Sequence, residues 1–202
     1  MCMVDMALGF PDQEDALKWV EVAFHVKQRL GDRTQMGLIA GLLGELYSNR
    51  GEEKHAIYWH NRSLESFQEL GARAGTATVL DHLGIIDIKR GSLKSALERF
   101  KRSLSLWEEL GDTKQVAFMR MKVSIALTSL GNVESAFPYA LAAVTQSDFL
   151  SQEITATLVV LLSDHLKILG NERFKVLVRQ HAGLRDPKKV LRLLKQLGLK
   201  GL

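Results

Sequence analysis

Apolar residues recur every three or four positions along most of the chain, which is the spacing of one face of an α-helix. In the segment from Gly31 to Gly71, the first apolar stripe consists of Leu38, Ile39, Leu42, Leu43, Leu46 and Tyr47. A second stripe consists of Ala56, Ile57, Trp59, Leu64 and Phe67. Gly51 separates the two stripes, and glycine commonly ends a helix because it accepts a left-handed backbone. The segment therefore predicts two helices, the second over residues 53–69.

The two-helix pattern repeats with a period of 40 residues. Leucine–glycine pairs recur at 30–31, 70–71 and 110–111. The same spacing relates the alanines Ala16, Ala56, Ala96 and Ala136. It also relates the glycines Gly51, Gly91 and Gly131. Because several series keep the same phase, they predict that one structural unit has been duplicated along the chain, which is the sequence signature of a repeat protein.

The repeat divides the chain into five parts, which we predict to form a single solenoid domain. They are a truncated first repeat at 1–30 with its second helix at about 13–30, repeats at 31–70, 71–110 and 111–150, and a degenerate repeat with a basic C-terminal capping helix at 151–202. Further helices are predicted at 74–89, 93–109, 133–145 and 172–181. One such unit cannot bury its own apolar face, so it must stack on its neighbours. The predicted fold class is all-α, a right-handed α-solenoid of stacked antiparallel helix pairs.

The order of residues within each unit resembles the tetratricopeptide repeat. The family pattern of Leu-Gly-x-x-Tyr, a turn glycine and then alanine is matched by Leu43, Gly44, Tyr47, Gly51 and Ala56. The second unit matches it at Leu83, Gly84, Gly91, Ala96 and Phe100, and the third at Gly131, Ala136 and Ala143. The period is longer than the usual ~34 residues and is similar to the longer-helix variant in kinesin light chains and many bacterial regulatory proteins.

The chain departs from the family pattern at three positions. Asp87 replaces the tyrosine, Ser124 replaces the glycine, and His60 stands where an aromatic residue is usual. Elsewhere the small residues of the pattern, such as Gly44 and Ala96, are predicted to let the two helices of a unit approach closely.

The composition indicates a soluble protein in a reducing compartment. Hydrophobic residues make up 46% and charged residues 25% of the chain, as in ordinary globular proteins. Cys2 is the single cysteine, so no internal disulfide can form. No apolar run, including that at 158–162, approaches the ~18 residues that span a membrane. Asp5 interrupts the apolar N-terminus, which lacks a preceding basic region. A cytoplasmic location is expected.

Catalytic and metal-binding patterns are not apparent in the sequence. It contains no glycine-rich phosphate loop, no His-Glu-x-x-His and no Gly-x-Ser-x-Gly. His55 and His60 are five residues apart, so they do not share the helix face that metal pairs at i and i+4 use. Each histidine is interpreted as a partly buried or surface residue. We therefore expect no enzyme activity, no cofactor and no bound metal.

The family resemblance implies a partner-binding groove lined by the first helix of each unit. The positions that it assigns to this groove are Leu38, Glu45, Thr78, Asp81, Ile85, Ile88, Phe118, Met121 and Ile125. Its C-terminal half is apolar and suits an amphipathic helix laid in a groove. Two alternatives leave the apolar stripe unavailable to a partner, because the chain's own C-terminal helices or a second copy of the chain can cover it.

Positive charge is concentrated near the C-terminus. From Asn171 onward nine basic residues face two acidic ones, so this segment carries +7 and the remainder carries −3. Lys188, Arg192 and Lys195 lie on one face of the last predicted helix. Such a basic face either binds nucleic acid, a membrane surface or an acidic partner, or serves as a solvated cap.

The leading functional hypothesis is a non-catalytic scaffold or adaptor that binds a peptide or amphipathic helix of another protein in the groove. The partner can also be a second copy of the chain. The alternative hypothesis is a nucleic-acid-associated or regulatory protein that uses the basic C-terminal helices. Salt separates the two, because binding through phosphates weakens steeply as ionic strength rises.

Overall fold

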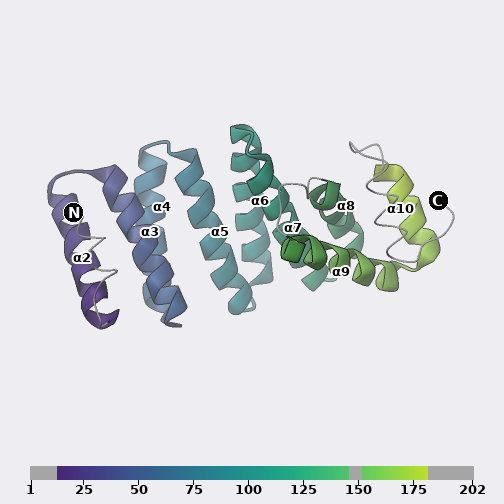
Figure 1. The fold of residues 1–202 in the computed structure, drawn as a ribbon, viewed down its shortest axis with the longest axis horizontal. Coiled ribbons are helices and arrows are strands. Elements are labelled where there is room, and N and C mark those ends of the chain that lie inside the picture. The colour runs from purple at the N-terminus through teal and green to yellow at the C-terminus, as the bar shows by residue number, and fades with distance from the viewer. Residues whose placement is uncertain (1–12, 146–151, 182–202) are drawn as a thin grey trace. The chain divides into compact units, whose positions relative to one another are not determined.

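The computed structural model describes residues 13–145 and 152–181. These residues hold nine α-helices and no strand, which confirms the all-α class (Figure 1). They fall into two compact units, with the division between Gly91 and Ser92. The division into repeats and the single solenoid domain stay predictions, and each unit is described by itself.

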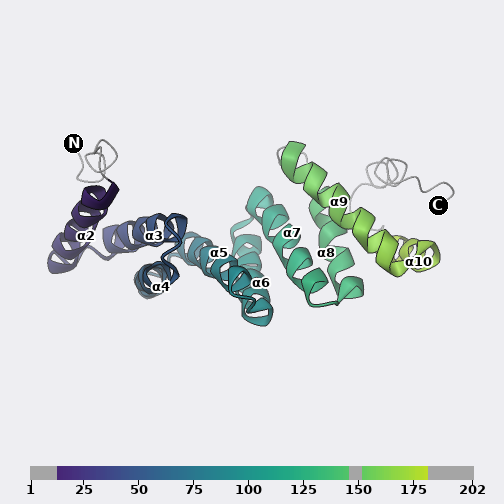
Figure 2. The same ribbon diagram turned by 90° about the horizontal axis from the view of Figure 1, so that it is seen from below.

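The N-terminal unit contains four helices joined by short turns. They are α2 (Gln13–Arg29), α3 (Arg33–Asn49), α4 (Glu53–Glu69) and α5 (Arg73–Lys89). Consecutive helices run in opposite directions, so α3 and α5 point the same way (Figures 1 and 2). The turn glycines Gly31, Gly51 and Gly71 have φ angles of 68°, 76° and 63°. Only glycine adopts this left-handed conformation without strain, so these residues end the helices where the sequence pattern predicts.

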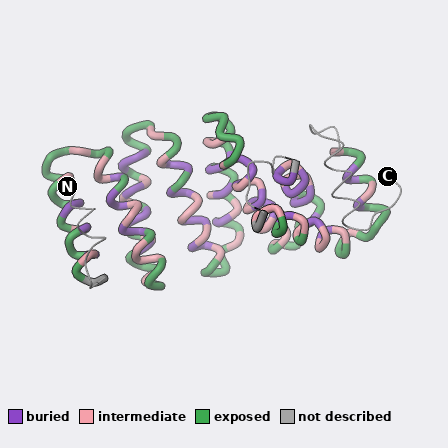
Figure 3. Tube along the Cα trace, viewed as in Figure 1, coloured by how far each residue is buried: buried purple, intermediate pink, exposed green. Residues whose placement is uncertain are grey.

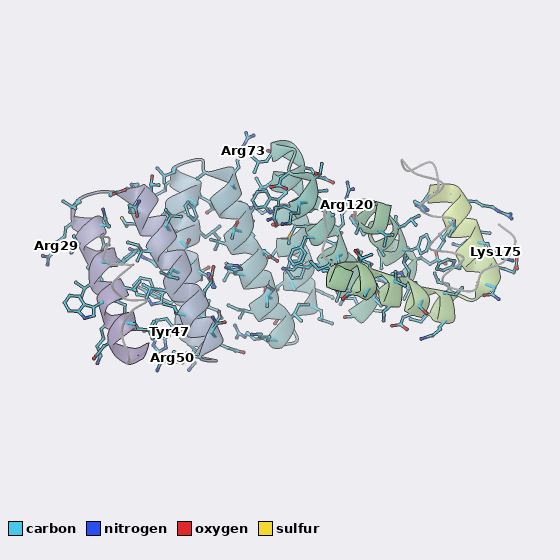
Figure 4. All side chains as sticks on the ribbon, in the orientation of Figure 1. Arg29, Tyr47, Arg50, Arg73, Arg120 and Lys175 are labelled. Carbon is cyan, nitrogen blue, oxygen red and sulfur yellow. The ribbon has the colours of Figure 1, made fainter. Side chains whose placement is uncertain are left out.

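The core of the N-terminal unit lies between α2, α3 and α4. Leu43 is fully buried, and the rings of Phe24 and Trp59 meet edge to face with centroids 4.9 Å apart. Figure 3 shows how buried and exposed residues alternate along each helix of this unit. The Tyr47 hydroxyl, labelled in Figure 4, donates a hydrogen bond of 2.7 Å to Glu21 Oε1 and ties α3 to α2. Burial, together with this bond, raises the pKa of Tyr47 to about 12.

The C-terminal unit contains five described helices. They are α6 (Leu93–Leu110), α7 (Thr113–Ser129), α8 (Val133–Thr145), α9 (Gln152–Leu169) and α10 (Asn171–His181). Its core includes the fully buried Phe137. The rings of Phe137 and Phe174 meet edge to face, with their centroids 5.0 Å apart. Ser124, which replaces the family glycine, buries its hydroxyl and donates a hydrogen bond of 2.9 Å to the carbonyl of Ala136. The substitution is tolerated because the added polar group is satisfied.

Ala96 gives a direct test of the close approach between helices. It is 0% exposed on α6, as Ala56 is on α4 and Ala136 on α8. The Ala96→Leu variant is expected to lose about 1–3 kcal/mol of unfolding free energy, because a larger side chain overpacks this contact. Urea denaturation measures the loss. Ser95→Leu, on the exposed side of the same helix, serves as the control and should change stability by less than about 0.5 kcal/mol. Equal effects of the two variants would contradict the packing.

Candidate binding groove

A hollow of about 240 Å³ lies between α3 and α5, and residues of α4 form its floor. Its lining residues are Gly37, Leu38, Gly41, Leu42, Glu45, Ser63, Phe67, Gly75, Thr78, Val79 and His82. All of them belong to the N-terminal unit. We call this space the apolar hollow, because most of its lining is aliphatic, aromatic or glycine.

Glycines on α3 and α5 create the apolar hollow by leaving room for the Phe67 ring. A Cβ atom added at Gly75 would lie 2.6 Å from this ring, and one added at Gly37 would lie 2.9 Å from it. Real Cβ atoms do not approach so closely, so both helices need glycine here. Beside the ring, the Ser63 hydroxyl donates a hydrogen bond of 2.7 Å to the Gly37 carbonyl. The Ser63 hydroxyl and the Gly37 carbonyl therefore satisfy each other beside the apolar floor.

A second hollow of about 280 Å³ adjoins the first toward the C-terminal ends of α3 and α5. Its lining residues are Glu45, Ser48, Asn49, His60, His82, Ile85, Ile86 and Lys89. We call it the polar hollow, because six of these residues carry polar side chains. The two hollows share Glu45 and His82, and together they form a groove along α3 and α5 that is apolar at one end and polar at the other.

Two histidines and a glutamate meet where the hollows join. His82 Nδ1 lies 3.6 Å from Glu45 Oε1, and the His82 ring lies 5.1 Å from the His60 ring between centroids. His60 is 1% exposed and packs against α3 at Gly44, where an added Cβ would lie 2.5 Å from the imidazole Nδ1. Burial, and then the charge of His82, lowers the pKa of His60 to about 4. His60 is therefore neutral near pH 7.

The structure brings together part of the predicted groove. Leu38, Glu45 and Thr78 line the apolar hollow, and Ile85 lines the polar hollow. Leu38 is 53% exposed and contributes accessible apolar surface to the apolar hollow. Asp81 and Ile88 lie on α5 and are partly buried, but they are not among the residues that line the two hollows.

The remaining groove positions lie on α7 in the C-terminal unit, where that unit's own core covers them. Met121 is 7% exposed and belongs to a core cluster with Leu158 and Leu162 of α9. Phe118 and Ile125 pack against this cluster. Thr128 of α7 also hydrogen-bonds His165 of α9, with Oγ1 and Nε2 2.8 Å apart. For these residues the structure matches the alternative in which the chain's own C-terminal helices cover the stripe.

The repeat pattern and the family resemblance did not indicate that Gly37, Gly75, Ser63, Phe67 or His82 belongs to a site. A usable signal was present, because Gly37, Gly41 and Gly44 recur at helical spacing on one helix. Glycine costs about 1 kcal/mol relative to alanine inside a helix, so three in one helix indicate that something lies close to its backbone.

Other site predictions fall outside the groove. Lys188, Arg192 and Lys195, the candidate basic patch, lie outside the described residues. Within the described part of the chain, no group of three His, Cys, Asp or Glu residues has a geometry suited to a metal ion. In that same part, the helices are too short or too polar to cross a membrane.

The described residues have the fold of a helical-repeat protein. A family model of the tetratricopeptide repeat matches residues 35–109, so this part of the chain carries tetratricopeptide repeats, as the resemblance predicted. Tetratricopeptide repeats generally mediate protein–protein interactions and are typically non-catalytic. No curated protein matches the chain.

Two solved structures share this fold. One is a signal transduction ATPase with numerous domains from Pyrococcus horikoshii that carries a tetratricopeptide repeat sensor, with a TM-score of 0.74 and 14% identity. The match covers 96% of the present chain and 30% of the ATPase, so the chain spans less than a third of that protein. The other is BtubC (BKLC) from P. vanneervenii, with a TM-score of 0.65, 16% identity, and 99% and 90% of the two chains covered. Both likenesses support the α-solenoid class.

Proposed function

We propose that the chain is a non-catalytic interaction module whose N-terminal unit binds a peptide segment or amphipathic helix of another protein. In this proposal the partner lies along α3 and α5 and inserts an apolar side chain into the apolar hollow. The observation that carries the proposal is the glycine-floored apolar hollow beside the half-exposed Leu38. Exposed apolar surface of this kind marks partner sites in soluble proteins.

The size of the hollow supports a polypeptide rather than a small molecule as the ligand. Small-molecule pockets usually measure about 300–1,000 Å³ and enclose most of the ligand. The apolar hollow, at about 240 Å³, is smaller and open along the groove. It has the size for one or two side chains, which is how helices and extended peptides anchor in grooves.

Replacing Leu38 with aspartate tests the proposed function. The charge at the mouth of the apolar hollow should lower partner affinity at least about tenfold, because a buried apolar anchor would meet an unpaired carboxylate. Wild type and variant are immobilised, exposed to lysate of the source cells, and compared by quantitative mass spectrometry. The affinity is then measured for each protein whose retention differs.

Leu70→Asp is the matched control, because Leu70 is a 43% exposed leucine of the same unit that lines neither hollow. A partner should be retained by wild type and by Leu70→Asp and lost from Leu38→Asp. Thermal melts of the two variants establish that both are folded. If all three proteins retain the same partners with equal affinity, the groove is not the binding site.

A further inference from the structure

We propose that the partner segment carries an arginine or lysine next to its apolar anchor, and that the polar hollow receives this cation while the apolar hollow receives the anchor. The inference rests on the proposed function and names the chemistry of the partner. It follows from the charges and hydrogen-bond acceptors at the junction of the two hollows.

Glu45 is the residue that would pair with the cation of the partner. Its carboxylate is half exposed and lines both hollows at the point where they meet. The neighbouring His82 Nδ1 lies 3.6 Å from Glu45 Oε1, which exceeds ordinary hydrogen-bond distance. The next ring behind it, His60, is buried and neutral, so this imidazole adds no positive charge that would repel a cation of the partner. A cationic side chain of the partner can therefore pair with Glu45.

The polar hollow offers acceptors that suit a group with several N–H donors. Besides Glu45, its lining residues include Ser48, which carries a hydroxyl, and Asn49, which carries a carboxamide. A guanidinium has five donors in one plane and an ammonium has three, and neither has an acceptor. Lys89, the basic residue of the lining, is exposed, so its long side chain can extend into solvent.

The charge of the N-terminal unit favours the same partner. Residues 1–91 contain ten basic and thirteen acidic residues, a net charge of −3 within a chain whose total is +4. A basic segment is therefore attracted to this unit over distances of about 8 Å at physiological salt, whereas an acidic segment is repelled.

The positions of the hollows set the spacing of the motif. Gly41 in the apolar hollow and Ser48 in the polar hollow are seven residues apart on α3, which corresponds to about 10 Å along the helix. A partner therefore needs its apolar and basic side chains about 10 Å apart. This separation corresponds to two turns of a helix, or to about three residues of an extended strand.

Parallel peptide selections test the inference. A phage-displayed library of random 12-residue peptides is selected on the full-length wild-type chain and on Glu45→Lys. We expect wild type to enrich peptides with an apolar residue and an arginine or lysine at a constant spacing. We expect Glu45→Lys to enrich aspartate or glutamate at the basic position and to bind the wild-type peptides about tenfold more weakly.

Glu53→Lys is the matched control, since it makes the same charge change at an exposed position in the first turn of α4 that lines neither hollow. It should select the same peptides as wild type. The inference is overturned if wild type selects acidic or uncharged peptides, or if Glu45→Lys keeps the preference of wild type.

The same peptides distinguish failure of the inference from failure of the proposed function. If Leu38→Asp loses them while Glu45→Lys binds them unchanged, the groove is the binding site and the inference about the cation is wrong. If Leu38→Asp binds them as well as wild type does, or if no peptide is enriched over background, both are wrong.

Discussion

The Gly44→Val variant is expected to lose about 3 kcal/mol of unfolding free energy, the upper end of the usual cost of overpacking. Gly44 is buried on α3, and a Cβ added there would lie 2.5–2.7 Å from three atoms of the His60 imidazole. The ring itself is 1% exposed and has little room to move away. Small domains are stable by only about 5–15 kcal/mol, so this loss is a large fraction of the total. Urea denaturation followed by far-ultraviolet circular dichroism measures it.

A second substitution at His60 shows whether the imidazole causes the loss. His60→Ala removes the ring, and the valine side chain at position 44 then fills part of the space it leaves. The loss of unfolding free energy in the double variant should therefore be smaller than the sum of the two single losses, by about 1–3 kcal/mol. Strict additivity would mean that Gly44 and His60 are not in the close contact described here.

The helices could be predicted from the sequence because their determinants are local. The predicted helix over 53–69 is α4 with the same bounds, and that over 133–145 is α8. In each case the turn glycine lies two residues before the start of the helix, and the apolar stripe follows within one or two turns. The same helix pattern also occurs in several repeats, so a chance match in one repeat has little effect on the prediction.

The apolar hollow could be predicted only in part, because it depends on glycines that leave room for a side chain of another helix. Leu38, Glu45 and Thr78 follow from the family resemblance, which assigns the first helix of each unit to the groove. The floor of the hollow is the Phe67 ring of α4, which packs against Gly37 of α3 and Gly75 of α5. A contact between three helices is not visible in the periodicity of any one of them, so the depth and size of the groove come from the tertiary structure.

For a related reason, the sequence left open whether a partner, the chain's own C-terminal helices or a second copy of the chain covers Met121. The 40-residue period weakens after residue 150, and the packing partners of Met121 on α9 lie in that irregular part. Periodicity shows that α7 has an apolar face, but it does not show which neighbour lies on it. The interpretation of all histidines as partly buried or surface residues was wrong for His60 and His165, which are 1% and 0% exposed.

The two buried histidines are expected to make the protein sensitive to acid. Burial lowers the pKa of His165 to about 4 despite the nearby Asp164, as burial and then His82 do for His60. An unfolded histidine titrates near 6.5, so below that pH the unfolded chain binds more protons than the folded chain. The stabilising contribution of each neutral histidine is therefore complete above pH 6.5 and is lost as the pH falls toward 4. At pH 5 the loss is about 2 kcal/mol for each histidine.

Single substitutions assign this acid sensitivity to individual residues. His60→Phe restores an aromatic ring of the kind usual at this position in the family, and His165→Gln keeps a hydrogen-bonding group near the Thr128 hydroxyl. Urea denaturation at pH 7.5 and pH 5.0 gives the change in stability with pH for each protein. Between pH 7.5 and pH 5.0, each variant should lose about 2 kcal/mol less unfolding free energy than wild type loses. The control is His25→Gln, at an exposed position on α2, which should lose as much as wild type does. Stopping at pH 5 keeps most carboxylates ionised, so a pH dependence that survives both buried substitutions would show that these imidazoles are not its source.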